Sequence, residues 1–541
     1  MKWKFVLGLL VLIVVSGAAC MGADPAPSQQ APVSKAGIAL EPVVAVVVPG
    51  TPNLQPTKHP NAQAGQPVSQ QDDATPTPRL LRRPNILFIL TDDLDTDSIK
   101  FMPLVKSLLI EPGASFSNHL INIPFCCPSR ASILRGQYAH NTHITSNRLP
   151  LGGFQKFHSL GLENSTVATW LHESGYRTML IGKYLNEYPE GAGETYVPPG
   201  WDQWHSPMKG NPYTGFGYIL NENGNLVSYG FGSGEYGTDV YAQRAADFIK
   251  ATTKDRRPFF IYLSTFTPHG AVGDGPAAPA PRHQNLFPEA RVPRTASFNE
   301  PDVSDKPASI RGLPRLTDNQ ISDIDNLYRR RLQSLMAIDE MVKSLVDTLK
   351  EVGQLENTYI VFTSDNGFHL GQHRLFSGKQ SPYEEDIRVP LVVRGPDVPS
   401  GLVIDHLTGN IDLAPTFAEW AGATTASFVD GRSLAPLLSR ELPAETPWRQ
   451  AFLIQKHTQA NPALFVVAPY QAIRTEKYLY VEYMNRDVEL YDLRQDPYQL
   501  DNLAAAADQA LLQRLSDRLA GLGQCAGEEC RLIENTPLLA E

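Results

Sequence analysis

The sequence predicts an α/β protein with a large, mostly parallel sheet covered by helices on both faces and followed by a small α+β subdomain. Continuous apolar runs of strand length at residues 85–90 and 358–363 are typical of parallel strands buried on both faces. Helical patterns alternate with such runs over most of the chain, as in α/β folds. Of the 541 residues, 42% are hydrophobic and 19% charged, a balance that suits a folded protein with more than one structural unit.

The charge balance and the cysteine count exclude several classes of protein. A net charge of −10, from 47 Lys and Arg against 57 Asp and Glu, argues against a nucleic-acid partner. Five cysteines are too few for a multi-finger zinc scaffold or a dense disulfide framework.

Residues 1–20 have the pattern of an export signal. A basic start precedes an apolar run at 5–15 and small residues that lead into Cys20. The run is shorter than the roughly 20 residues that a membrane-spanning helix needs. Two alternatives stay open: Cys20 is lipidated, as in bacterial lipoprotein signals, or the protein is simply secreted. We expect an exported protein, extracellular, periplasmic or anchored to the cell envelope, whose only membrane contact is through this signal or its lipid.

Residues 21–83 are rich in Pro, Ala, Gln, Ser and Thr, a composition that buries too little apolar surface to fold. We interpret this segment as a flexible linker. It is either a tether that holds the folded body away from a membrane or an unremarkable disordered leader.

The folded part is expected to form two units, residues 84–440 and 441–541. In the first, strands are expected at 85–90, 178–181, 259–264 and 358–363, and helices at 102–109, 165–174, 238–250 and 317–352. The Pro- and Ala-rich stretch at 270–315 is expected to be a long surface insertion. In the second, strands at 472–476, 478–483 and 488–493 and a helix at 508–522 predict a small antiparallel sheet with one helix. Near the end of the chain, Cys525 and Cys530 favour a local disulfide over free thiols or a metal site.

Acidic residues follow two of the expected strands. Asp92 and Asp93 come directly after the first, and Asp365 and Asn366 after the last. Ligands of open α/β sheets collect at the carboxyl ends of the strands, so these four side chains are expected to form an all-oxygen site for Ca²⁺ or Mg²⁺ rather than zinc. The alternative interpretation is that both pairs are ordinary turn and helix-cap residues.

The motif Cys126-Cys127-Pro128-Ser129-Arg130 lies between these acidic pairs. Taken alone, adjacent cysteines are equally two small buried residues at a helix start. The motif resembles the maturation signature of type I sulfatases, in which a cysteine is oxidised to formylglycine. In this chain the modified residue would be Cys126, with Cys127 at the variable position.

Further segments resemble the same family in the same order and extend the resemblance over residues 84–440. They are PNILFILTDD at 84–93, GKYLN at 182–186, TPH at 267–269, TSDNG at 363–367, GK at 378–379 and IRVP at 387–390. Residues 489–493 resemble the small C-terminal subdomain of these enzymes. The resemblance implies an alkaline phosphatase-like fold and a sulfuric ester hydrolase.

The resemblance also implies roles for individual residues. The four strand-end residues would bind the divalent cation, most often Ca²⁺ in this family. Arg130 and Lys183 would hold the formylglycine, and His269 and Lys379 would engage the sulfate ester. Taken alone, without the resemblance, His269 is better interpreted as a loop histidine that caps a turn, and Lys379 as a solvated charge.

These residue types suit the hydrolysis of a sulfate monoester. The ester is an anion, so the cation and the basic side chains must neutralise its charge before a nucleophile attacks. Hydrated formylglycine is a geminal diol, and one hydroxyl attacks sulfur while His269 or Lys379 protonates the leaving alcohol. The second hydroxyl then loses its proton, sulfate leaves and the aldehyde re-forms. An unmodified thiol cannot complete this last step, so a formylglycine-generating enzyme is an expected partner during maturation.

The chain departs from the family at one position. Many sulfatases have a histidine two residues after the lysine that corresponds to Lys183, whereas this chain has Leu185 followed by Asn186. The group that takes the proton in the elimination step is therefore open, with His369 and, as a polar contact, Asn186 as candidates.

The resemblance is strongest to the branch that contains N-acetylglucosamine-6-sulfatases and extracellular heparan 6-O-endosulfatases. A sulfated sugar such as N-acetylglucosamine 6-sulfate is therefore the expected substrate. The long basic insertion of the endosulfatases is missing from this sequence, so exo action or a broad arylsulfatase activity stays open. The remaining alternatives are a phosphate or phosphonate monoester hydrolase of the same superfamily and an inactive, surface-displayed binding protein.

Overall fold

The computed structural model describes residues 83–270, 275–439, 448–458 and 466–537. The expected signal at 1–20 with Cys20, the linker up to residue 82 and the expected boundary at 440–441 lie outside the described residues. Among the residues that are described, no helix has the length and apolar character needed to cross a membrane.

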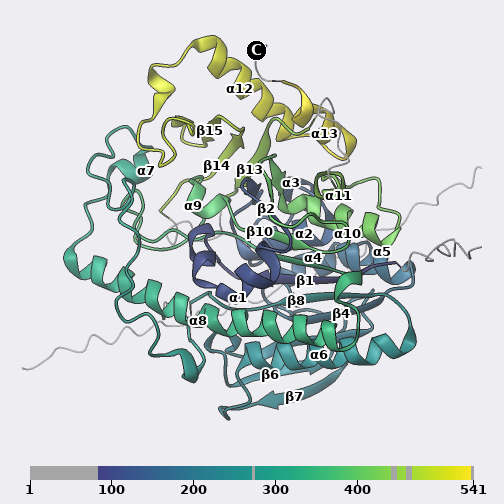
Figure 1. Ribbon diagram of the computed structural model, residues 1–541. Coiled ribbons are helices and arrows are strands. Elements are labelled where there is room, and N and C mark those ends of the chain that lie inside the picture. The colour runs from purple at the N-terminus through teal and green to yellow at the C-terminus, as the bar shows by residue number, and fades with distance from the viewer. Residues whose placement is uncertain (1–82, 271–274, 440–447, 459–465, 538–541) are drawn as a thin grey trace, which may run out of the picture. The chain divides into compact units, whose positions relative to one another are not determined.

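A ten-stranded sheet forms the main part of the molecule, in the order β11-β2-β10-β9-β1-β8-β4-β5-β6-β7 (Figure 1). Its five central strands run parallel to one another. These are β9 (Thr358–Ser364), β1 (Asn85–Thr91), β8 (Phe259–Ser264), β4 (Arg177–Gly182) and β5 (Gln203–Gly210). On one side, β10 (Leu391–Arg394) is antiparallel to β9 and to β2 (Ala114–Phe116), and the edge strand β11 (Leu402–Ile404) is parallel to β2. On the other side, β6 (Tyr218–Glu222) is antiparallel to β5 and to β7 (Asn225–Tyr229).

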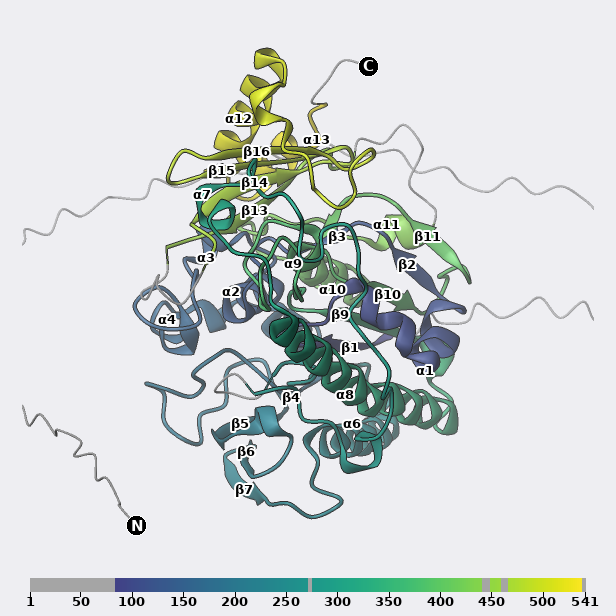
Figure 2. The same ribbon diagram turned by 90° about the vertical axis from the view of Figure 1, so that its left-hand side faces the viewer.

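Helices cover both faces of this sheet, as Figures 1 and 2 show. On β1, Ile86, Phe88 and Leu90 belong to one apolar core, and Leu87 and Ile89 belong to the other. This alternation follows from the two-residue period of a strand. The first core includes α2 (Cys126–Arg135), α5 (Val167–Glu173) and α10 (Leu413–Ala421), and the second includes α6 (Gly237–Asp255) and α8 (Asp318–Glu351). The expected fold class is confirmed.

Helix α8 confirms the expected long helix. Thr317 caps its first turn, because the hydroxyl accepts a hydrogen bond from the backbone N–H of Gln320, whose own side chain accepts from the Thr317 N–H. The expected helix at 102–109 is shorter and less regular: α1 (Pro103–Val105) continues as a π-type turn (Lys106–Ile110). Asp339 on α8 accepts hydrogen bonds from the backbone N–H groups of Leu104 and Val105, which anchors this segment to the long helix.

The C-terminal part contains a four-stranded antiparallel sheet with two helices, where three strands and one helix were expected. The strands are β13 (Phe452–Lys456), β14 (Tyr470–Arg474), β15 (Tyr478–Tyr483) and β16 (Val488–Asp492), and the helices are α12 (Gln509–Leu522) and α13 (Glu528–Asn535). A disulfide joins Cys525, which follows α12, to Cys530 in α13. The small sheet contacts the main body through Tyr383, whose hydroxyl donates a 2.9 Å hydrogen bond to Glu489 on β16.

Short elements connect these helices and strands, together with six further 3-10 turns at 162–164, 212–214, 281–283, 355–357, 410–412 and 503–505. They are the 3-10 turn Thr96–Phe101, β3 (His119–Leu120), α3 (Ala139–Thr142), α4 (Gly153–Ser159), α7 (Ala308–Arg311), α9 (Glu384–Ile387), β12 (Thr408–Gly409) and α11 (Ala435–Leu438). The stretch expected as a surface insertion at 270–315 has a buried ion pair between Lys306 and Glu300, 3.2 Å apart. Lys306 and Glu300 therefore pack into the body, whereas much of the rest of this stretch, such as Arg282, Leu286 and Arg291, is exposed, as expected for a surface insertion.

Candidate active site

The functional candidates from distant parts of the sequence meet at one edge of the main sheet. Four neighbouring strands, β9, β1, β8 and β4, run parallel, so their carboxyl ends lie at the same edge. Asp365 and Asn366 follow β9, Asp92 and Asp93 follow β1, and Lys183 follows β4 directly. Thr91 of β1 lies opposite Ser364 of β9, which brings the two acidic pairs together.

Cys126 is the first residue of α2 and lies in the middle of this group. Its side chain is buried, with Sγ 3.5 Å from Asp92 Oδ1, and it accepts a 2.8 Å hydrogen bond from Lys379 Nζ. Burial raises the pKa of the Cys126 thiol to about 12, in spite of the opposing effect of Lys183 and Lys379. The encoded thiol is therefore protonated at neutral pH and is a poor nucleophile.

The acidic pairs hold one another in place through short polar contacts. The backbone N–H of Asp93 donates to Asp365 Oδ1 at 3.2 Å, and Asn366 Nδ2 donates to Asp93 Oδ1 at 2.6 Å. Asp93 has a φ of 68°, a left-handed conformation that aspartate and asparagine adopt more readily than other non-glycine residues. All four side chains are buried, so their charges need compensation.

Two oxygens of this group remain unpaired within the described part of the chain. Asp93 Oδ2 and Asn366 Oδ1 are both buried and have no hydrogen-bond partner there. Ligand atoms of Asp92, Asp93, Cys126 and His269 all lie within 4.8 Å of one another. Buried oxygens without donors are costly, and a cation would satisfy them. The residues present therefore fit a metal ion at this edge of the sheet.

Basic side chains surround the acidic ones. Lys183 Nζ contacts Asp92, Lys379 Nζ contacts Asp93, and Arg130 Nε lies 2.7 Å from Asp365 Oδ2. Burial by itself would raise the pKa of Asp92, but the charges of Lys183 and His269 outweigh it and lower the pKa to about 2. Asp92 is thus a carboxylate at neutral pH.

Arg130 ties α2 to the ends of two strands. Its Nη1 donates to the backbone carbonyl of Lys183 at 3.0 Å and to Ser264 Oγ at 2.5 Å. The guanidinium is almost fully buried, and the carboxylate of Asp365 compensates its charge. These contacts fix the start of α2, and with it Cys126, against β4 and β8.

His269 adds an imidazole to the group. Its Nδ1 lies 2.7 Å from the carbonyl oxygen of Gly270, and because a carbonyl only accepts, Nδ1 carries a proton. Nε2 lies 3.5 Å from Asp93 Oδ2. His369 is oriented differently: its Nδ1 pairs with the Asp386 carboxylate at 2.9 Å, and its backbone pairs with Gly378. His369 is therefore bound, through its backbone contacts with Gly378, to the loop that carries Lys379.

Two residues of this region were missed by sequence reasoning. Arg331 on α8 is buried and donates to the backbone carbonyl of Asp93, while its guanidinium lies 4.3 Å from the ring centroid of Phe368. The sequence signal that could have identified Arg331 is an arginine on the apolar, buried face of an amphipathic helix. The ring of Tyr213 lies 4.8 Å from that of His269, in a loop that has no sequence signal.

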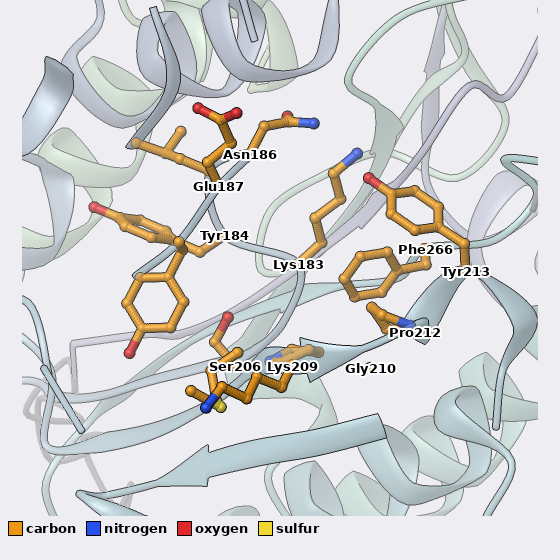
Figure 3. Close-up of a pocket in the computed structure, with 14 residues that line it drawn as sticks. Lys183, Tyr184, Asn186, Glu187, Ser206, Lys209, Gly210, Pro212, Tyr213 and Phe266 are labelled. Carbon is orange, nitrogen blue, oxygen red and sulfur yellow. The ribbon is translucent and has the colours of Figure 1, made fainter. Parts of the chain in front are cut away.

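A pocket of about 220 Å³ opens beside Lys183 (Figure 3). One wall comes from residues 183–188, after β4, and the other from residues 206–213, with Phe266. Figure 3 shows the hydroxyl of Tyr213 directed toward the ammonium group of Lys183. Asn186 lines this pocket, and Leu185, in the position where many sulfatases have histidine, is buried in the core. An amide does not take up a proton at neutral pH, so Asn186 acts only through hydrogen bonds.

Comparisons with known proteins agree with this geometry. The sulfatase family model matches residues 84–423, and a model described as N-sulphoglucosamine sulphohydrolase, C-terminal, matches residues 371–524. The N-acetylglucosamine-6-sulfatase of Homo sapiens is 35% identical over 485 residues, which cover 83% of this chain and 86% of that protein. A putative extracellular sulfatase Sulf-1 homolog of Caenorhabditis elegans is 38% identical over 69% of this chain, which spans only 52% of that relative.

A solved structure gives the same result at the level of the fold. It is described as a complex with its substrate D-glucosamine-2-N,6-O-disulfate, and it superimposes with a TM-score of 0.69 and 25% identity over 85% of this chain and 100% of that one. The family model alone spans more than half of the chain, and the human relative matches over most of its own length. The chain therefore belongs to the sulfatase family, whose members hydrolyse sulfuric ester bonds.

Proposed function

We propose that this sulfatase hydrolyses the sulfate ester of a sulfated sugar of the N-acetylglucosamine 6-sulfate type, with a formylglycine formed from Cys126. The observation that carries the proposal is the position of Cys126, between Asp92 and the ammonium group of Lys379, at the first turn of α2. A group at this position faces the ammonium group of Lys379 and the carboxylates that would hold a metal ion, and both cations would neutralise the charge of a sulfate ester.

The metal would be held by Asp92, Asp93, Asp365 and Asn366. Carboxylate and amide oxygens suit Ca²⁺, and Mg²⁺ is the alternative. The two unpaired oxygens, Asp93 Oδ2 and Asn366 Oδ1, support this assignment because neither has a hydrogen-bond partner among the described residues. A bound cation supplies charge neutralisation of the sulfate group.

The basic residues would act on the ester from the remaining sides. Lys183 and Arg130 would position the start of α2 around residue 126. Arg130 donates to the backbone carbonyl of Lys183 and is held in place by its ion pair with Asp365. Lys379, 2.8 Å from Cys126 Sγ, would contact the sulfate and protonate the leaving alcohol. His269 would engage the sulfate ester: the contact of its Nδ1 with the Gly270 carbonyl orients the ring, and its Nε2 lies 3.5 Å from Asp93 Oδ2, beside Cys126.

The substrate class rests on the relatives. The human relative is an N-acetylglucosamine-6-sulfatase, and the solved structure holds a glucosamine disulfate. The export signal at 1–20, lipidation of Cys20, the linker at 21–83 and the division of the folded part at 440 belong to the same proposal. A relative described as extracellular supports export.

The proposal is tested with protein produced together with a formylglycine-generating enzyme. Release of free anion is measured from N-acetylglucosamine 6-sulfate, an aryl sulfate and an aryl phosphate, with Cys126→Ala as control. We expect the sugar sulfate to give the highest kcat/KM and the control to lose about 10⁴-fold or more. A preference for the phosphate ester, or full activity of Cys126→Ala, would overturn the proposal.

A further inference from the structure

A single guanidinium group, that of Arg331 on α8, contacts the chain after three of the four strands that build the site. Its Nη2 donates to the backbone carbonyl of Asp93, after β1, and its Nη1 donates to that of Pro268, after β8, at 3.4 Å. The group also lies 4.3 Å from the ring centroid of Phe368, after β9. We propose that Arg331 is a positioning residue, which sets Asp93 and, to a smaller extent, His269 for the metal ion and the ester. This role rests on the proposed function and deepens it.

The backbone of Asp93 is held on both of its sides. Its φ of 68° lies in the left-handed region, which a non-glycine residue keeps only where its surroundings fix it. The N–H of Asp93 donates to Asp365 Oδ1 at 3.2 Å, and its carbonyl accepts from Arg331. Loss of Arg331 would therefore free the carbonyl side of Asp93 and let its carboxylate leave the cluster of ligand atoms around Cys126.

Arg331 also reaches the segment that carries His269. The carbonyl of Pro268, the residue before it, accepts from Nη1 at 3.4 Å, which is at the long end of the range for hydrogen bonds. This segment has other support, since the carbonyl of Thr267 accepts a 3.3 Å hydrogen bond from the N–H of Asp92. The effect of Arg331 on His269 is therefore smaller than its effect on the metal site.

Arg331 is the counterpart of Arg130 on the opposite face of the sheet. The two arginines come from α8 and α2, whose apolar residues belong to the two different cores. Arg130 contacts the chain at the ends of β4, β8 and β9, and Arg331 contacts it after β1, β8 and β9. Together they hold all four strand ends that carry the functional side chains.

A simple ion pair does not account for the place of Arg331. The residue is only 1% exposed, and the carboxylate of Asp95 lies 3.4 Å from its Nη2. That carboxylate also accepts from the backbone N–H and the hydroxyl of Ser98. A lysine could supply the charge, but a guanidinium donates from two nitrogens in one plane while its face packs against an aromatic ring. The contacts therefore need an arginine at this position, not only a positive charge.

The test measures Ca²⁺ binding directly, so it does not depend on the activity of the enzyme. The full-length protein is freed of metal with a chelator, and Ca²⁺ is titrated into the parent protein and the variants by isothermal titration calorimetry. Arg331→Leu removes the guanidinium, and Arg331→Lys keeps the charge. Arg330→Leu is the matched control on the same helix, since Arg330 contacts Gln333 within α8. Asp93→Asn identifies the site, because it removes the charge of a ligand.

We expect Arg331→Leu to weaken Ca²⁺ binding about 10- to 100-fold and Arg331→Lys about 3- to 10-fold. Arg330→Leu should stay within about twofold of the parent protein. An Arg331→Leu protein that binds Ca²⁺ as tightly as the parent would overturn the inference. If Arg331→Leu does not fold, Arg331→Lys decides in the same way. If neither folds, Arg331 belongs to the fold, and the inference is overturned as well.

Two further results separate the causes of a loss. Arg449, which is buried against Asp412 and Glu534, provides a control for the removal of any buried arginine. Arg449→Leu should keep the Ca²⁺ affinity of the parent, and an equal loss in this variant would overturn the role of Arg331. If the parent binds no Ca²⁺, or if Asp93→Asn binds it equally well, the metal site of the proposed function fails, and the positioning role fails with it. If only Arg331→Leu binds Ca²⁺ like the parent, the positioning role fails alone.

Discussion

The edge of the main sheet and the junction with the C-terminal subdomain both bury several charged side chains, but they pair them differently. At the junction, Arg449 donates to both oxygens of Asp412, one at 2.8 Å, and its Nε donates to Glu534 at 2.9 Å. The remaining oxygen of Glu534 accepts from the hydroxyl of Tyr138. Each polar atom of the Arg449, Asp412 and Glu534 side chains therefore has a partner.

The edge of the sheet is incompletely paired by comparison. Asp93 Oδ2 and Asn366 Oδ1 lack hydrogen-bond partners in the described chain, and so does Nη2 of Arg130. Buried charge alone thus does not distinguish a functional site from a structural one. The kind of unpaired atom does: the oxygens of Asp93 and Asn366 are acceptors among carboxylates, which a cation can complete, whereas the unpaired atoms beside the junction, Arg432 Nε and His119 Nε2, are nitrogens.

Removal of the arginine at the junction should have the largest effect on stability. Arg449→Leu leaves the carboxylates of Asp412 and Glu534 buried without their main partner, so we expect unfolding free energy to fall by about 3–5 kcal/mol. Urea unfolding measures this, and sulfatase activity per folded molecule should be unchanged. Arg494→Leu, which removes an exposed ion pair, is the control and should change little. A stability near that of the parent protein would contradict the structural role of the junction.

Removal of a lysine at the edge of the sheet should act on catalysis instead. Lys379→Ala removes the cation that lies 2.8 Å from Cys126 Sγ, and we expect kcat/KM to fall about 10²- to 10³-fold. Steady-state kinetics on the sugar sulfate measures the loss, and a thermal melt checks the fold. Activity within a few-fold of the parent enzyme would show that Lys379 does not engage the ester.

Chelation of divalent cations should affect both activity and stability at the edge of the sheet. Activity should be lost and should return with Ca²⁺, because the carboxylates of Asp92, Asp93 and Asp365 need a cation. A metal present at 100 times its Kd contributes about 2.7 kcal/mol to stability, so the melting temperature should also fall. Cys126→Ala should show the same fall, which separates metal binding from catalysis. An enzyme that keeps full activity in chelator would contradict a metal site.

Acid should destabilise the junction gradually through His119. This histidine is buried beside Asp412, and burial lowers its pKa from 6.5 to about 3. The unfolded chain binds the proton more readily, so stability is lost as pH falls from 6.5 toward 3, by at most about 1.4 kcal/mol per pH unit. The pH dependence of urea unfolding measures this slope. His119→Gln should flatten it, and an unchanged slope in this variant would argue against His119 as the cause.

Several strands of both sheets and the long helix could be predicted because their signals are local. The strands β8 and β15 begin and end where their apolar runs do, and α8 begins after its Thr317 cap. The acidic pairs also follow from sequence, since parallel strands place their carboxyl ends at one edge.

The outer strands and the pocket could not be predicted in the same way. The strand β5 contains Pro207, and its register with β6 is irregular. Its sequence pattern therefore does not predict a strand. Tyr213 comes from a loop after this strand, and only the folded chain brings it to His269. Asn186 could be named from its motif, but its unpaired oxygen is a property of the packing around it.

The modification of Cys126 is the central claim and can be measured directly. The peptide that contains Cys126 is isolated from protein produced with a formylglycine-generating enzyme and analysed by mass spectrometry. Conversion of the thiol to the aldehyde is expected to lower the peptide mass by about 18 Da, together with sulfatase activity that Cys126→Ala lacks. An unmodified cysteine in a preparation that still hydrolyses the sulfate ester would contradict the claim.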